Sequence, residues 1–168
     1  MSGSGLRARA KIFLCLWMDC GEKPRFYIIR NGVLNMDENR ILWKKCAELH
    51  GHECGGLTIG YKAALYAIRL LKLSGLEDDQ IACICESKSC AVDAFKAIFG
   101  VSGEKGSLFL HPTGLSAYSV YNRRNSTAVR LVLKPAPEGL TREMSFAYYQ
   151  ALDPADMFDV EPAKYALP

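Results

Sequence analysis

The segment Gln80–Gly100, QIACICESKSCAVDAFKAIFG, decides the fold because it joins a buried strand directly to an amphipathic helix. Its first part, Gln80–Glu86, is a short apolar run of the length of a buried strand. Its second part, Cys90–Phe99, has apolar residues at helical spacing and ends at Gly100, a residue typical of helix C-termini. Cys90 therefore stands where a strand passes into a helix, which is a common place for ligand sites.

On the N-terminal side of this segment the apolar pattern predicts two helices. The first covers about 38–49, and the second begins at Leu57 and ends near Ser74-Gly75. His50–Gly56 forms a glycine-rich turn between them, and residues 77–79 form a polar loop.

On the C-terminal side the pattern predicts strands over 107–110, 116–121 and 127–133. We interpret them as a three-stranded antiparallel meander. A last helix over 140–151 starts at Thr141 and is followed by a tail rich in Pro, Asp and Ala. The predicted fold class is α+β, with the sheet covered by helices.

The composition is that of one ordinary globular domain, with 168 residues, 49% hydrophobic and 23% charged. Residues 1–35 hold six basic and two acidic residues, a net charge of +4, so the rest of the chain carries −1 of the total of +3. We expect them to be an N-terminal extension, disordered or outside the evolved domain, and 36–168 to be a single domain. The body is almost neutral and has no apolar run of membrane-spanning length, so we expect no nucleic-acid and no membrane partner.

The chain has seven cysteines, an odd number whose spacing is not that of a secreted disulfide framework. They are Cys15, Cys20, Cys46, Cys54, Cys83, Cys85 and Cys90. We expect a reducing cytoplasm, in which thiols stay free or bind metal. Cys83 and Cys85 share one face of a strand and Cys46 lies on an apolar helix stripe, so these three are interpreted as core residues.

The turn His50-Gly51-His52-Glu53-Cys54 holds three ligand-type side chains in five positions. Imidazole nitrogen and thiolate sulfur bind zinc and similar ions. Cys54 and Cys90 both precede a predicted helix, whose positive end favours thiolate over thiol. We therefore predict a site made of His50, His52, Cys54 and Cys90, with the two cysteines as candidate catalytic residues.

Several neighbouring residues receive weaker predictions. Glu86 is a candidate ligand, base or partner of a histidine, and Lys88 is expected to lower the pKa of the Cys90 thiol. The loop Gly100–Gly106 lacks the Walker spacing and is interpreted as a flexible rim of the active site. His111 is interpreted as a turn residue. Tyr118, Tyr121, Asn122, Arg123 and Arg124 form an aromatic and basic cluster, which suits a solvated hairpin tip, an anion site or an interface between copies of the chain.

The run from His50 to Ala64 resembles the opening motif of the FmdE family, named for the E component of formylmethanofuran dehydrogenase. The matching residues are His50-Gly51-His52-x-Cys54-x-Gly56-Leu57-x-Ile59-Gly60-Tyr61-Lys62-Ala63-Ala64. The resemblance continues through Glu86-x-x-x-Cys90-x-Val92-Asp93-Ala94, Lys105-Gly106-x-Leu108, Tyr121-Asn122-Arg123 and Ala128-Val129-Arg130. It covers residues from about 38 to 134, in the same motif order.

The resemblance implies a thioredoxin-like α+β core with a mixed sheet, commonly as a homodimer. It also implies His50, His52, Cys54 and Cys90 as the site. Some members add a C-terminal zinc ribbon, which we do not expect here because no cysteine follows Cys90. Members are associated with molybdenum or tungsten formylmethanofuran dehydrogenase in methanogens, and many occur in anaerobic bacteria without that pathway.

Two residues depart from the family pattern. The family usually has proline after the first motif cysteine, where this chain has Gly55, so the turn is expected to be looser. It often has a cysteine after the third helix, where this chain has Val101, which argues against a redox mechanism through that position.

Three functions stay open. The first is a metal-binding accessory or sensor-like protein of anaerobic one-carbon or redox metabolism, with a divalent ion such as zinc, beside formylmethanofuran dehydrogenase or another redox complex. The second is a thiol redox enzyme with Cys54 as nucleophile and Cys90 as resolving thiol. The third is a dimeric interaction module without catalysis, for which a large exposed apolar patch would be the sign.

Overall fold

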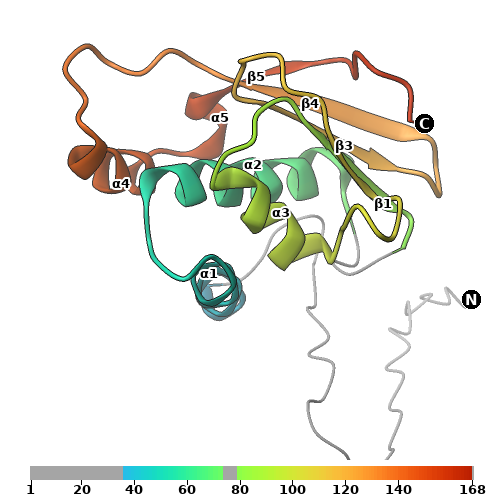
Figure 1. Ribbon diagram of the computed structural model, residues 1–168, viewed down its shortest axis with the longest axis horizontal. Coiled ribbons are helices and arrows are strands. Elements are labelled where there is room, and N and C mark those ends of the chain that lie inside the picture. Colours follow the sequence, from blue (N-terminus) through green and yellow to red (C-terminus); the bar gives the residue numbers. More distant parts are fainter. Residues whose placement is uncertain (1–35, 74–78, 168) are drawn as a thin grey trace, which may run out of the picture.

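The computed structural model describes residues 36–73 and 79–167, and it confirms the α+β class (Figure 1). The helices are α1 (Met36–His50), α2 (Gly55–Leu71), α3 (Ala91–Phe99), α4 (Arg142–Ala151) and α5 (Pro154–Met157). The strands are β1 (Ile81–Cys85), β2 (Leu108–Leu110), β3 (Ala117–Asn122), β4 (Thr127–Leu133) and β5 (Phe158–Glu161). The N-terminal extension, Cys15, Cys20 and the loop residues 77–78 lie outside the described residues. The domain boundaries and the similarity of the core to thioredoxin stay predictions.

The five strands form one mixed sheet in the order β2-β1-β3-β4-β5. β1 and β2 run parallel, with Cys83 opposite Leu108, and the other neighbouring pairs are antiparallel. We predicted that β2, β3 and β4 form an antiparallel meander. This prediction is wrong for β2, which does not pair with β3, because β1 lies between them. The cause is α3, which serves as the crossover that a parallel pair requires and returns the chain beside β1.

The last two elements, α5 and β5, were not predicted from the sequence, where their residues were interpreted as part of a C-terminal tail without helix or strand. Asp153 caps α5 by accepting a hydrogen bond from the backbone N–H of Ala155, and Pro154 occupies the first turn. β5 then pairs with β4 at the edge of the sheet, with Phe158 opposite Leu133. Phe158 is the buried residue of this strand and the rest are exposed, so β5 lacks the alternation that marks a strand in sequence.

Helices α1, α2 and α3 lie on one side of the sheet (Figure 1). The main core forms between them and the sheet, and it includes Cys46, Cys83 and Cys85, which confirms these thiols as core residues. Burial raises the pKa of Cys46 and of Cys85 to about 12. These thiols therefore stay protonated at neutral pH and act as small apolar side chains.

Helix α2 lies at the centre of the molecule and approaches α3 very closely. A Cβ atom on Gly60 would lie 2.2 Å from the carbonyl oxygen of Ala91, so only glycine fits there. α2 ends at Leu71, slightly before the expected end, because Lys72 adopts a left-handed conformation with φ of 50°. None of the helices described over 36–73 and 79–167 is long and apolar enough to cross a membrane.

Candidate metal centre

Three of the four predicted site residues meet at the ends of three different helices. His50 is the last residue of α1, Cys54 is the N-cap of α2, and Cys90 is the N-cap of α3. One donor atom from each lies within 4.8 Å of the other two. The Nε2 atom of His50 is 3.7 Å from the Sγ atom of Cys54.

The turn between α1 and α2 brings His50 and Cys54 together. Gly51 has a φ of 88°, which glycine adopts without strain, and its N–H donates to the carbonyl of Ala47. Cys54 is extended, and its sulfur accepts a hydrogen bond from the backbone N–H of Leu57. This cap places the sulfur at the N-terminal end of α2.

Glycines on α2 make room for the second thiol. A Cβ atom on Gly56 would lie 3.1 Å from the Cβ of Cys90 and 3.5 Å from its sulfur. The absence of side chains at Gly56 and Gly60 allows the start of α3 to pack against the N-terminal half of α2. Gly55 is the first residue of α2 and is buried, with Ser145 directly against it. Its missing side chain provides the space that Ser145 occupies, and the looser turn expected at Gly55 stays a prediction.

The donor set fits a tetrahedral zinc site. Zinc–sulfur and zinc–nitrogen bond lengths place a thiolate and an imidazole ligand about 3.6 Å apart at the tetrahedral angle. The observed separation between His50 Nε2 and Cys54 Sγ is 3.7 Å. This separation is compatible with a zinc ion between the two atoms, and it is also that of a hydrogen bond between the thiol and the ring nitrogen.

Asp93 orients the imidazole of His50 and was not assigned this role from the sequence. Its Oδ2 atom lies 2.9 Å from His50 Nδ1, while Oδ1 accepts a hydrogen bond of 2.9 Å from Lys96. Because a carboxylate only accepts, Nδ1 carries the proton and the lone pair on Nε2 faces Cys54. The signal in the sequence was the spacing Cys90-x-x-Asp93, which puts both residues on one side of the first turn of α3.

Glu86, the residue proposed from the sequence for contact with a histidine, is engaged elsewhere. It is fully buried and accepts hydrogen bonds from Arg130 Nε at 2.6 Å and Arg130 Nη2 at 3.0 Å. Thr113 donates a third bond to it, and Arg130 also pairs with Glu161. These bonds hold the pKa of Glu86 below its usual value, so Glu86 is a structural carboxylate and not a ligand.

The electrostatics of Cys90 also differ from expectation. Burial, and then the neighbouring Cys54, raise the pKa of the Cys90 thiol, while Arg142 opposes the rise. Lys88 was expected to lower this pKa, but the cation that acts on Cys90 is Arg142 on α4. The proximity of Cys54 therefore adds to the cost of ionising Cys90.

His52 does not join the group formed by His50, Cys54 and Cys90 among the described residues. It is exposed, and its ring centroid lies 4.4 Å from that of His50. The neighbouring Glu53 points away, since it accepts a 2.6 Å hydrogen bond from the indole of Trp43.

Comparisons with known proteins place this site in a family. The family model for FmdE, described as "Molybdenum formylmethanofuran dehydrogenase operon", matches residues 49–156, a span that contains His50, Cys54 and Cys90. The chain belongs to the FmdE family. The resemblance seen in the sequence is thereby confirmed.

A solved structure supports the fold of this FmdE-family chain. It is the crystal structure of an FmdE-like protein, named for tungsten formylmethanofuran dehydrogenase, from Syntrophus aciditrophicus. The two share 23% sequence identity and a TM-score of 0.60, over 76% of this chain and 73% of the other. No curated protein matches the sequence.

The loop Gly100–Gly106 of this FmdE chain is not a rim of the metal centre. It follows the C-terminal end of α3, whereas Cys90 stands at the other end, roughly 13 Å away along the helix. The loop is held by hydrogen bonds, from Lys105 Nζ to the Gly100 carbonyl and from Arg123 to the Gly106 carbonyl. The prediction that this loop forms a rim of the site is therefore wrong, because the loop lies at the other end of α3.

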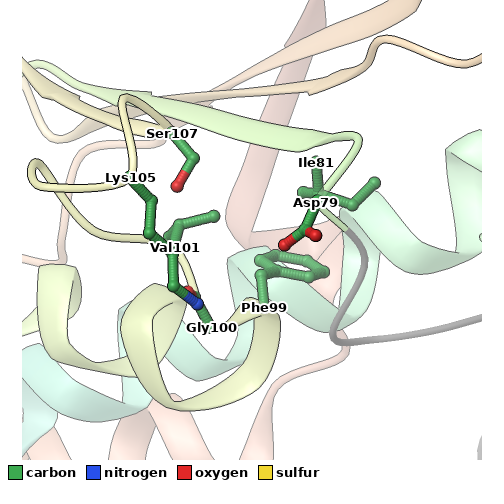
Figure 2. Close-up of a pocket in the computed structure, with 7 residues that line it drawn as sticks. All are labelled: Asp79, Ile81, Phe99, Gly100, Val101, Lys105 and Ser107. Atoms are coloured by element: carbon green, nitrogen blue, oxygen red, sulfur yellow. The ribbon is translucent and has the colours of Figure 1, made fainter.

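A cavity of about 500 Å³ lies beside this loop (Figure 2). It is lined by Asp79, Ile81, Phe99, Gly100, Val101, Lys105 and Ser107. Its polar groups are largely engaged, since Lys105 bonds to Gly100 and the Ser107 hydroxyl bonds to Ser102. The cavity lies at the C-terminal end of α3, whereas Cys90 is at the N-terminal end of that helix.

The aromatic and basic cluster around the hairpin is divided by the fold. Tyr118 and Tyr121 are buried, and Arg123 anchors the neighbouring loop, so the cluster is not one solvated surface. His111 packs its ring on Tyr165, with centroids 4.5 Å apart. It lies outside the group of donor atoms formed by His50, Cys54 and Cys90.

Proposed function

We propose that this FmdE-family protein binds a divalent metal ion, most suitably zinc, through His50 Nε2, Cys54 Sγ and Cys90 Sγ. The observation that carries the proposal is the meeting of these three donors within 4.8 Å, with one pair 3.7 Å apart. A carboxylate behind the histidine, here Asp93, is the usual second partner of a zinc-bound imidazole.

A set of two cysteines and one histidine leaves a fourth position for water or substrate. A metal ion held in this way supplies Lewis-acid chemistry, or it is passed to another protein. Among residues 36–73 and 79–167, His52 is exposed and packs its ring near that of His50, so a rotation of its side chain could complete the set. The catalytic role predicted for Cys54 and Cys90 is, in this proposal, the role of ligands.

The cellular role that we propose follows the family. The family description ties FmdE to a molybdenum formylmethanofuran dehydrogenase operon. We therefore propose an accessory protein of anaerobic one-carbon or redox metabolism, acting in the cytoplasm as a homodimer beside such a dehydrogenase or another redox complex.

Metal analysis of the purified protein tests the site. We expect about one equivalent of zinc in the wild type and a loss of most of it in His50→Ala, Cys54→Ser and Cys90→Ser. Cys46→Ala is the matched control, because that thiol is buried in the core and should not change the metal content. Retention of full stoichiometry in the three ligand variants would remove the cluster from consideration.

His52→Ala separates a three-ligand from a four-ligand site. We expect this variant to keep its metal, since His52 lies outside the donor group. If it loses zinc as completely as Cys54→Ser does, the fourth position is filled by His52 and the site is closed.

Thiol redox chemistry is the second candidate function, favoured by the proximity of the Cys54 and Cys90 sulfur atoms. In metal-free protein, a disulfide-forming oxidant such as diamide would take two electrons as the two thiols lose their protons and join. Peptide mass spectrometry would locate the bond. A disulfide that forms reversibly in apo protein but not in zinc-loaded protein would show that the two activities compete for the same sulfur atoms.

A further inference from the structure

The cavity beside the loop Gly100–Gly106 lies at the opposite end of α3 from the candidate metal centre (Figure 2). Its volume of about 500 Å³ is that of a small-molecule site. The Asp79 carboxylate and the Phe99 ring lie together on one side of it, whereas Lys105 and Ser107 lie on the other side (Figure 2). The proposed metal function makes no use of this cavity.

The walls of the cavity offer an apolar surface. Three of the side chains that line it are Ile81, Phe99 and Val101. All three belong to the main hydrophobic core, so the core packs behind this wall and holds it in place. A preformed apolar wall binds the apolar part of a ligand, and an aromatic ring within it also attracts organic cations.

The polar groups of the cavity differ in whether the chain already satisfies them. The Ser107 hydroxyl donates to the Ser102 carbonyl at 3.3 Å and accepts from the Ser102 N–H at 3.1 Å. Lys105 Nζ donates to the Gly100 carbonyl at 3.0 Å. The Asp79 carboxylate, by contrast, has no hydrogen bond or ion pair within the part of the chain that the structure describes. The polar group that is left for a ligand is therefore an anionic acceptor.

The end of α3 adds to the preference for a cation. The C-terminal end of a helix carries a partial negative charge, and Gly100, the C-cap of α3, is one of the residues that line the cavity. The ammonium group of Lys105 already binds the Gly100 carbonyl, so the chain itself places an ammonium group at this helix end. Lys105 lies across the cavity from Asp79 and leaves that carboxylate available (Figure 2).

We propose that this cavity binds a small organic amine in its protonated form. The ammonium group pairs with Asp79, and an apolar body packs against the wall formed by Ile81, Phe99 and Val101. The class is an alkylamine or arylalkylamine with one positive charge, because one carboxylate is available. A neutral alcohol of the same shape binds more weakly because it lacks the charge. The site is independent of the proposed metal function, since none of the three metal-binding residues lines the cavity.

Titration of the isotope-labelled protein with benzylamine, followed by NMR, tests the proposal. We expect saturable shifts of the amide signals of the residues that line the cavity. Benzyl alcohol, which has the same shape without the charge, should bind about tenfold more weakly. Asp79→Asn should also weaken benzylamine binding about tenfold, because the ammonium group loses its charged partner. Asp79 is exposed, so this variant keeps the fold.

Asp156→Asn is the matched control, because it removes an exposed carboxylate from α5, a helix that does not line the cavity. It should leave the benzylamine affinity unchanged. Cys54→Ser should also leave it unchanged, since Cys54 belongs to the metal centre. If benzyl alcohol binds as tightly as benzylamine, or if Asp79→Asn binds the amine as well as wild type, the amine site is wrong. Shifts that do not saturate, or that lie away from the cavity, overturn it as well.

Discussion

The Oδ2 atom of Asp93 lies 2.9 Å from the Nδ1 atom of His50, and this contact joins the first turn of one helix to the last residue of another. Lys96 holds the other oxygen of Asp93 from the following turn of α3. The chain Lys96–Asp93–His50 therefore orients the imidazole before any ion arrives. Such preorganisation raises the metal affinity of a site whose three ligands come from three helices.

Asp93→Asn should weaken metal binding by about tenfold to a hundredfold, because the amide no longer stabilises the protonated Nδ1. A zinc competition titration with a chromophoric chelator measures the change. Lys96→Met is the matched control, because it leaves the contact between Asp93 and His50 intact and should have a much smaller effect. An affinity of Asp93→Asn equal to that of wild type would show that the contact does not support the site.

Gly56→Ala should impair metal binding more than stability. The added methyl group would lie 3.1 Å from the Cβ of Cys90, at the edge of tolerable contact, so the start of α3 must shift by a few tenths of an ångström. A shift of this size separates the two sulfur atoms while the core adjusts around it. Zinc affinity and the urea midpoint of the apo protein, measured together, distinguish the two effects.

Two other glycines provide controls for that variant. Gly60→Ala places its methyl group 2.2 Å from the Ala91 backbone oxygen, so it should destabilise the fold by about 1–3 kcal/mol or more. Gly51→Ala meets no atom within 4 Å but has a φ of 88°, so only backbone strain of about 1 kcal/mol is expected. If Gly56→Ala behaves like Gly60→Ala, with stability lost before affinity, the explanation by local sulfur spacing is wrong.

Acid should destabilise the protein through Glu86. Arg130 holds the pKa of this buried carboxyl below its ordinary value of 4.5, so the folded state binds the proton more weakly than the unfolded state. Stability from this group is therefore complete above about pH 4.5 and is lost as the pH falls further. Urea unfolding between about pH 7 and pH 3 should show a shallower acid limb in Glu86→Gln than in wild type.

Arg130→Met tests the same ion pair from its other side. It leaves the Glu86 carboxylate buried without its main partner, which costs about 3–5 kcal/mol at neutral pH. Protonation of Glu86 removes the cost of burying an unpaired charge. The free energy of unfolding of the variant should therefore fall less on acidification than that of wild type. Parallel acid limbs in the two proteins would contradict the assignment of the pH dependence to this pair.

Lys62→Met should loosen α4. Lys62 Nζ donates to the carbonyls of Gln150 and Leu152, at 3.0 and 2.7 Å, and so ties the C-terminal end of α4 to α2. The loss of these charged hydrogen bonds should cost about 1–3 kcal/mol. Arg69→Gln, which removes an exposed 3.5 Å contact with Asp153, should cost less than about 1 kcal/mol. Thermal unfolding of both variants makes the comparison, and equal costs would contradict the proposed anchoring.

The local elements of this protein follow from its sequence. The apolar spacing of α1, the strand at 81–85 and the glycine after α3 mark these elements because helix and strand periods are local properties. The ligand-type residues at His50, Cys54 and Cys90 were also visible, since a glycine turn and two helix starts are local signals. The buried state of Cys83 and Cys85 followed from their shared strand face.

Contacts between distant segments were decided by the tertiary structure alone. The crossover through α3 places β1 inside the sheet. Glu86, which follows β1, there forms an ion pair with Arg130, 44 residues away. The carboxylate that contacts His50 is instead that of Asp93. The docking of α4 brought Ser145 against Gly55, and the charge that opposes the rise in the pKa of Cys90 is that of Arg142 on this helix, where the sequence pointed to Lys88. Local patterns in the sequence identify the side chains that could form a site. Which of them contact one another depends on how the helices and strands pack, because packing brings together residues that are far apart in the sequence.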